Sequence, residues 1–304
     1  MRVDPEVDSK WAFDAYQQVR ERLPQAGGET RPMMVNSLAD LADQFDVFLL
    51  DAYGVLNIGE QAIPGTCRRI ADLQAASKRV MVVTNSAGYP KRLLMKRYER
   101  LGYTFAAEDI VSSRETLLAA LQNEEPRRWG LMAAAEYGTE EFEKLDITFL
   151  RNDPKDYDTA ESFILLGTGD WTDAQQSLLE KSLRQNPRPV FVGNPDIVAP
   201  VEGGLSKQPG HYAHSLADTT GCTPAFFGKP FANIYELVFR RLPSDINRNR
   251  VVMVGDTLHT DILGGQVAGV KTALVTDYGS LKGFDIASAI ATSGIFPDFI
   301  LPSP

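Results

Sequence analysis

The stretch FLLDAYGVLNIGE, residues 48–60, decides the fold class that we expect for this chain. The run from Val47 to Leu50 is apolar throughout, which is typical of a strand that is covered on both faces of a sheet. The run stops at Asp51, and apolar residues resume after Gly54. A carboxylate at the end of a buried strand is costly unless it has a partner or a chemical role. Asp51 is therefore the first candidate for a functional residue.

Segments with helical periodicity alternate with further apolar runs of strand length. The predicted helices are residues 37–45, 66–77, 90–102, 233–242 and 261–269, and the predicted strands after the first are residues 80–84, 251–256 and 271–276. Strands joined in this way by helices need right-handed crossovers. The pattern predicts an α/β fold with a doubly wound parallel sheet.

The middle of the chain differs from its two flanks. Residues 124–218 contain strand-like runs and a predicted helix at 172–185, which opens with a capping box, and charged, turn-rich stretches interrupt them. We predict a second α/β module here, inserted into a core formed by residues 31–123 and 219–304. Residues 1–30 are polar and of mixed charge, and we expect an extension outside the core, either an appended helix or a loose arm.

Composition and charge restrict the class of partner. The formal net charge of -9 argues against nucleic acid or an anionic membrane as a partner, because both require a basic surface. There is no apolar run of about 18 residues, the N-terminus has no apolar signal segment, and the chain has only two cysteines. We therefore expect a cytoplasmic protein. An acidic protein can still bind a small phosphorylated molecule if a metal ion and backbone amides supply positive potential locally.

Polar residues follow several of the apolar runs. Ligands of open α/β sheets bind beyond the carboxyl ends of the strands, so polar residues at those ends are expected to lie close together. The candidates are Asp51, the run Thr84-Asn85-Ser86, Lys229, and Asp256 with Asp261. One polar strand end means little, but four of these types indicate a single site.

Each of these residue types has a role in phosphoryl transfer. A carboxylate such as Asp51 can attack phosphorus and divide a difficult hydrolysis into two steps. A lysine and a hydroxyl stabilise the charge on the transferred group. Magnesium prefers oxygen ligands from one or two carboxylates. Asp51 and Asp256 meet that demand, with Asp261 as a ligand or as an anchor.

The order of the motifs resembles that of a known superfamily. DxxGVL at residues 51–56 is followed by TNS at 84–86, GKP at 228–230 and GDTLHTD at 255–261. This order resembles the haloacid dehalogenase (HAD) superfamily of hydrolases, which use an aspartate nucleophile. The inserted module resembles the α/β cap of class IIA, the group with nitrophenyl-phosphatase-like and pyridoxal-phosphatase-like proteins. NPD at residues 194–196 is also similar to that group.

The resemblance implies a catalytic role and a phosphate-binding role for five of these residues. Asp51 would be the nucleophile. Thr84 and Asn85, with Ser86, would hold the phosphoryl group. Lys229 would neutralise the nucleophile and the phosphate. The implied substrate is a small phosphorylated metabolite, and a homodimer is the assembly that we leave open.

The resemblance also implies a magnesium site. Asp256 and Asp261 would bind Mg²⁺ together with Asp51 and the backbone carbonyl of Tyr53. The implied activity is that of a magnesium-dependent phosphatase acting through an aspartyl-phosphate.

Tyr53 departs from the pattern of the superfamily's phosphatases. Those enzymes have a second aspartate at this position, which protonates the leaving oxygen and later activates water. A tyrosine with an ordinary pKa of about 10 is a poor base at neutral pH, so we expect low activity. DAYG also resembles the first motif of the 2-haloacid dehalogenases, which need no magnesium. Two alternatives therefore stay open, a dehalogenase and a non-catalytic binder of a phosphorylated ligand.

Overall fold

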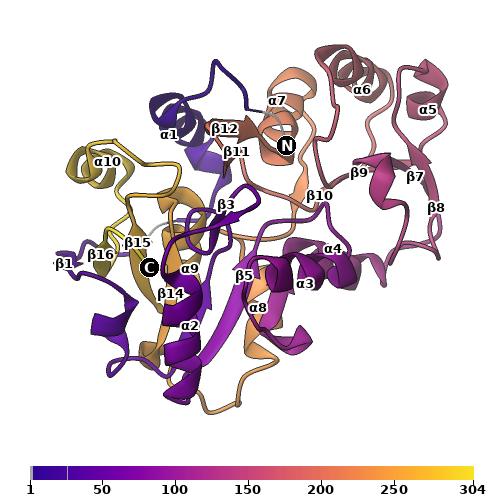
Figure 1. Cartoon of the computed structure of the whole chain (residues 1–304). Helices are drawn as coiled ribbons and strands as arrows, with labels where there is room; N and C mark the ends of the chain where they lie inside the picture. The colour runs from indigo at the N-terminus through magenta and orange to yellow at the C-terminus, as the bar shows by residue number, and fades with distance from the viewer. Residues whose placement is uncertain (1–2, 26) are drawn as a thin grey trace.

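The structure is a computed structural model, and it describes residues 3–25 and 27–304. It contains a seven-stranded and a five-stranded sheet, each flanked by helices (Figure 1). This arrangement confirms the predicted fold class, a doubly wound parallel sheet with a second α/β unit inserted into it.

The larger sheet has the strand order β1-β16-β15-β14-β2-β5-β6, and every neighbouring pair is parallel. Its strands are β1 Met33–Met34, β16 Phe299–Leu301, β15 Lys271–Val275, β14 Val251–Gly255, β2 Val47–Leu50, β5 Arg79–Thr84 and β6 Ile110–Ser112. The DAYG motif follows β2, which lies between β14 and β5. Residues from both ends of the chain therefore meet at the centre of this sheet.

Helices cover both faces of the larger sheet. The helices of this part are α2 Thr66–Ala75, α3 Lys91–Arg100, α4 Ser113–Leu121, α8 Ala232–Phe239, α9 Leu263–Val267 and α10 Ile286–Ser293. Alternate side chains of β2 point to opposite faces, so Leu50 packs with Ile70 of α2, whereas Leu49 packs with Ile234 of α8. This two-sided burial explains why β2 reads as a continuous apolar run.

Most predicted helices agree with the structure, and the segment at residues 37–45 is the exception. Only a single 3₁₀ turn, Leu38–Leu41, forms there. Leu38 and Leu41 are fully buried, and β2 begins at Val47, so little chain is left for further helical turns. The helix predicted at 261–269 opens with a π-helical turn, Leu258–Ile262, which continues into α9.

The smaller sheet has the order β13-β10-β9-β7-β8, again with parallel neighbours. Its strands and helices are β7 Arg128–Met132, β8 Asp146–Phe149, β9 Ser162–Leu165, β10 Val190–Val192, β13 Ala225–Phe226, α5 Pro154–Asp158, α6 Asp173–Gln185 and α7 Pro209–Thr220. The capping box of Thr172 and Gln175 is present at the start of α6. We propose this unit as the cap, and because β13 belongs to its sheet, we propose that the cap extends beyond residue 218.

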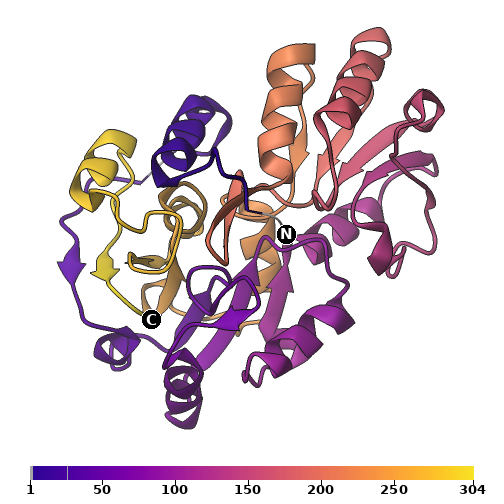
Figure 2. The ribbon, with the colours of Figure 1, turned by 45° about the horizontal axis from the view of Figure 1, so that its top comes forward.

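Two hairpins and one helix complete the chain. The antiparallel hairpins are β3 Asn57–Ile58 with β4 Gln61–Ala62, and β11 Val198–Val201 with β12 Gly204–Lys207. Helix α1, Ser9–Gln18, is capped by the Asp8 side chain. It lies between α10 of the larger unit and α7 of the smaller one (Figure 2). No helix in the described part of the chain has the length and apolar character needed to cross a lipid bilayer.

Candidate active site

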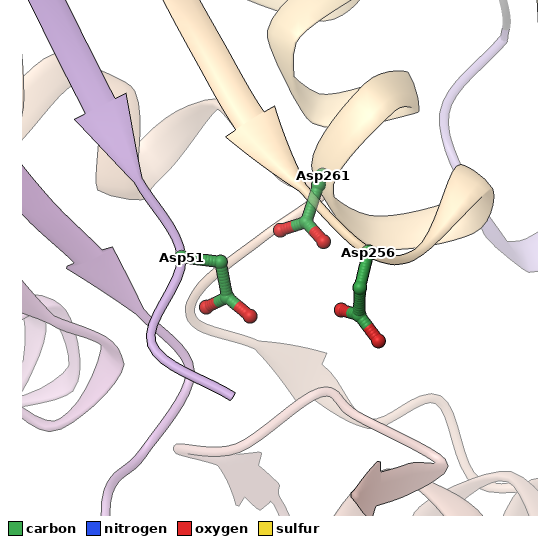
Figure 3. Close-up of side chains that lie close together, drawn as sticks. All are labelled: Asp51, Asp256 and Asp261. Atoms are coloured by element: carbon green, nitrogen blue, oxygen red, sulfur yellow. The ribbon is translucent and has the colours of Figure 1, made fainter. Parts of the chain in front are cut away.

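Three carboxylates meet at the carboxyl ends of the central strands of the larger sheet. Asp51 follows β2, Asp256 follows the neighbouring strand β14, and Asp261 lies in the π-helical turn after it. Each offers a carboxylate oxygen within 4.8 Å of the others, and Figure 3 shows the three side chains converging. The three carboxylates, which come from distant parts of the chain, therefore lie close together at one edge of the sheet.

Lys229 lies between two of these carboxylates. Its Nζ donates to Asp51 Oδ1 at 2.5 Å and to Asp261 Oδ1 at 2.7 Å, and the side chain is almost fully buried. Burial alone would lower the pKa of Lys229, but the charges of Asp261 and Asp51 outweigh it and raise the pKa well above its usual value. The lysine is therefore a fixed cation beside the candidate nucleophile.

The carboxylates have more negative charge than Lys229 can neutralise. Burial, followed by repulsion from Asp261 and Asp256, raises the pKa of Asp51 well above its usual value, although Lys229 opposes the shift. Burial and the charge of Asp261 raise the pKa of Asp256 to about 6. Asp256 is held by Ser280 N–H at 2.6 Å and by the Thr257 hydroxyl at 3.0 Å. Three buried acids with one lysine fit a divalent cation bound by oxygen ligands.

Gly54 allows the DAYG loop to close against this cluster. Its φ of +83° lies in the left-handed region, and a Cβ at this position would lie 2.6 Å from Asp256 Cγ. Any side chain here would push Asp256 away, because both the backbone angle and the space require glycine.

Tyr53 lies in a buried position beside Arg97. The Arg97 guanidinium lies 4.9 Å from the centroid of the tyrosine ring, and its Nε donates to Glu60 Oε1 at 2.9 Å. The Tyr53 hydroxyl has no hydrogen-bond partner among the described residues, and burial raises the pKa of the phenol well above its usual value. The phenol is therefore an even weaker acid than a free tyrosine. The contribution of Arg97 was not predicted, because nothing in the sequence indicates which face of α3 meets Tyr53.

Asn85 connects three parts of the site. Its Oδ1 accepts from Lys229 N–H at 2.8 Å, and its Nδ2 donates to the Lys229 carbonyl at 2.9 Å and to Asp196 Oδ1 at 2.8 Å. The side chain of Asn85 therefore positions the lysine loop and the cap loop. Thr84 and Ser86 lie beside it, with Ser86 N–H donating to Thr84 Oγ1 at 3.1 Å.

Asp196 reaches the site from the cap. Burial raises its pKa to about 7, although the charge of Lys229 and the bond from Asn85 oppose the shift. A cavity of about 560 Å³ opens beside it and is also lined by Tyr53 and Ser86. The NPD motif at residues 194–196 indicates this loop, but nothing in the sequence places the Asp196 side chain in the site.

His259 lies beside the acidic cluster without facing the cavity. Its Nε2 lies 2.7 Å from Gln17 Oε1 and its ring stacks on Tyr16, with 5.1 Å between the centroids. Burial lowers the pKa of His259 to about 3, so it is neutral at physiological pH. These contacts assign it to the packing of α1.

The fold and the site together are those of a hydrolase built on a doubly wound parallel sheet, with a candidate aspartate nucleophile. Residues 48–148 match the family described as haloacid dehalogenase-like hydrolase, and residues 226–301 match the family described as HAD-hydrolase-like. The chain belongs to the haloacid dehalogenase-like hydrolases.

The relatives of the chain belong to the class IIA group. It is 28% identical to human glycerol-3-phosphate phosphatase, over 92% of this chain and 96% of the relative. It is 27% identical to phosphoglycolate phosphatase 2 of Arabidopsis thaliana, over 88% of this chain and 94% of the relative. It is 23% identical to 4-nitrophenylphosphatase of Schizosaccharomyces pombe, over 87% and 93%.

Solved structures share the fold. A possible sugar phosphatase of the HAD superfamily from Cytophaga hutchinsonii superposes with a TM-score of 0.77 at 24% identity, covering 91% of this chain and 98% of that one. The p-nitrophenyl phosphatase from Archaeoglobus fulgidus gives a TM-score of 0.67 at 21% identity, covering 86% and 97%. The predicted resemblance to this superfamily is confirmed, whereas the roles of individual residues stay predictions.

Proposed function

We propose that the chain is a magnesium-dependent phosphatase that cleaves a small phosphate monoester through an aspartyl-phosphate on Asp51. The observation that carries this proposal is the Asp51 carboxylate, held by Lys229 within a buried cluster of acids beside a cavity. The names of the relatives, which include phosphatases of glycerol 3-phosphate and phosphoglycolate, support a small phosphorylated substrate.

In the first step an oxygen of Asp51 forms a bond to phosphorus, and the bond from phosphorus to the ester oxygen breaks. The leaving oxygen takes up a proton from solvent water, and the alcohol departs; the water that cleaves the acyl phosphate in the next step returns one proton to the solvent. In the second step water cleaves the acyl phosphate, which releases inorganic phosphate and restores the Asp51 carboxylate. Lys229 stabilises the charge on the transferred group in both steps, and its bond to Asp261 keeps it in place.

The acidic cluster would hold the magnesium ion. Asp51, Asp256 and Asp261 are the side chains that would bind it, with the Tyr53 carbonyl as a further ligand. When bound, Mg²⁺ neutralises the negative charge that nucleophile and phosphate share. The Thr84 hydroxyl and the Ser86 segment would contact the phosphoryl group beside Asp51.

Tyr53 makes this phosphatase slow. A phenol with a raised pKa and no hydrogen-bond partner among the described residues is a weak general acid. It does not act as a base toward water at neutral pH. We therefore expect turnover well below that of an enzyme with a carboxylic acid at this position.

The alternatives rest on Tyr53 alone. A dehalogenase would share the DAYG motif, but it has no use for the additional acids Asp256 and Asp261, whose charge Lys229 does not neutralise. A non-catalytic binder would explain the lost proton donor, but it needs no nucleophile that is hydrogen-bonded to a buried lysine. A phosphatase needs both the additional acids and the nucleophile beside the buried lysine.

The test is phosphate release from a broad panel of phosphomonoesters with Mg²⁺, for the wild type and for Asp51→Asn. We expect multiple turnovers by the wild type and none by the variant. Absence of turnover by the wild type, or equal activity of the variant, contradicts the proposal. Chloride release from 2-chloropropionate with a chelator present would instead show a dehalogenase, and thermal stabilisation by a phosphorylated ligand without turnover would show a binder.

A further inference from the structure

The cavity that Tyr53, Ser86 and Asp196 line has acidic walls and no basic ones. Among the described residues that line it there are three acids, Glu136, Asp170 and Asp196, and no lysine, arginine or histidine. The buried lysine of the site, Lys229, already donates hydrogen bonds to Asp51 and Asp261. A carboxylate on the substrate's alcohol would therefore lose its hydration here without gaining a cation.

The cavity also has aromatic walls. The rings of Tyr89 and Tyr137 lie with their centroids 4.9 Å apart, and Trp171 is fixed by a bond from its Nε1 to Gln176 Oε1 at 3.2 Å. Flat aromatic side chains pack well against the apolar faces of rings, and the exposed carboxylates of Glu136 and Asp170 can accept hydrogen bonds from hydroxyl groups. The volume of about 560 Å³ is in the range of sites for molecules larger than a two-carbon acid.

We infer that the substrate is a phosphate ester of a neutral, hydroxylated, ring-sized alcohol, and that carboxylate-bearing esters such as phosphoglycolate are poor substrates. Glu136 and Asp170 are the residues that reject the carboxylate. This inference rests on the proposed phosphatase function. It separates this chain from the phosphoglycolate phosphatase among its relatives.

The experiment compares kcat/KM for glucose 6-phosphate and for 2-phosphoglycolate at one Mg²⁺ concentration and one ionic strength. We expect glucose 6-phosphate to be favoured by at least about tenfold. Asp170→Lys should raise the ratio of phosphoglycolate to glucose 6-phosphate. Asp173→Lys makes the same charge change at an exposed position outside the cavity lining, and it should leave that ratio unchanged.

The outcomes are distinguishable. If no ester of any kind is hydrolysed, the proposed function fails, and this inference fails with it. If esters are hydrolysed but phosphoglycolate is used as well as glucose 6-phosphate, only the inference fails. A ratio that Asp170→Lys and Asp173→Lys change equally also overturns it.

Helix α1 contacts both sides of the site. The Tyr16 hydroxyl accepts a hydrogen bond from Ile197 N–H at 3.0 Å, directly after Asp196 of the cap loop. The Tyr16 ring stacks on His259, and Gln17 bonds the same histidine, two residues before Asp261. One turn of α1 thus touches the cap loop, residues 194–197, and also the segment that carries Asp256 and Asp261.

Other described residues between Asp4 and Arg22 bind the same two units. On the cap side Asp4 forms an ion pair with Lys207 at 3.0 Å, and Arg22 forms one with Asp218. On the core side Gln17 Nε2 donates to the Thr292 carbonyl at 3.1 Å. Residues 4–22 therefore join the cap to the core.

We propose that Tyr16 is a positioning residue that holds the cap loop 194–197 against the segment of residues 256–261. Tyr16→Phe keeps the ring on His259 and removes only the oxygen that accepts from Ile197, so a buried N–H loses its partner. We expect the loop to loosen, KM to rise several-fold with a smaller change in kcat, and hydrogen exchange in residues 194–201 to become faster.

Tyr157→Phe is the matched control, because Tyr157 also makes one bond to a backbone group, the Arg151 carbonyl at 2.7 Å, away from this loop. Exchange in residues 194–201 that is unchanged by Tyr16→Phe overturns the proposal, as does an equal effect of Tyr157→Phe. The exchange measurement needs no turnover, so it decides the matter even if the chain hydrolyses no ester.

Discussion

The substitution Tyr53→Asp tests the argument about the missing proton donor directly. A general acid–base group contributes about 10²–10⁴ to the rate. The Arg97 guanidinium, 4.9 Å from the present ring, would lower the pKa of a new carboxylate and leave less of its acid form at neutral pH. We therefore expect the low end of the range, a gain of about 100-fold in kcat, which corresponds to about 2.7 kcal/mol of activation free energy.

The gain has a cost in stability. Tyr53 is only 8% exposed, and loss of its ring should lower the free energy of unfolding by about 3–5 kcal/mol, as for other large aromatic side chains. Pairing of the new carboxylate with Arg97 offsets part of this. Thermal unfolding therefore has to be measured beside the kinetics, so that only folded protein is compared.

The assay is phosphate release with Mg²⁺ from an alkyl ester, glycerol 3-phosphate, and from 4-nitrophenyl phosphate. Nitrophenolate leaves more readily without a proton, so the gain should be larger for the alkyl ester. Tyr53→Asn is the matched control, with the same size and no titratable group. If Tyr53→Asp is no faster than Tyr53→Asn while both are folded and bind Mg²⁺, the reasoning about proton transfer is wrong.

Three further substitutions test the electrostatics and the packing. Lys229→Met removes the cation between buried acids and should lower the free energy of unfolding in EDTA by about 3–5 kcal/mol. Mg²⁺ should restore part of this loss, and Lys144→Met at an exposed position should cause no such loss. Equal stability of the two variants in EDTA contradicts this. Burial lowers the pKa of His214 from 6.5 to about 4, so the unfolded chain alone binds a proton between these values, and stability falls as pH drops through this window. The free energy of unfolding in urea should fall by about 2 kcal/mol less between pH 7.5 and pH 5 for His214→Phe than for the wild type. An unchanged pH dependence would refute the lowered pKa of His214. Gly54→Ala would place a Cβ against Asp256 and should weaken Mg²⁺ binding about tenfold or more by calorimetry, so unchanged affinity would contradict that close approach.

Much of this site could be predicted because parallel strands end at the same edge of a sheet. Asp51 and Asp256 each follow an apolar run, and once the runs are taken as parallel strands their side chains must come close together. The same reasoning did not find Asp196 or Arg97. Asp196 lies on a loop of the inserted unit, and Arg97 lies on a helix whose orientation follows from packing.

The sequence alone determined the kinds of elements, the polar residues at the strand ends and the departure at Tyr53, because these follow from local periodicity and residue type. The tertiary structure decided which distant groups share the site. Asn85 is hydrogen-bonded to both Lys229 and Asp196. Tyr16 accepts a hydrogen bond from the cap loop, and its ring stacks on His259. Such contacts join residues more than a hundred positions apart, and they depend on how whole units pack, which local sequence patterns do not record.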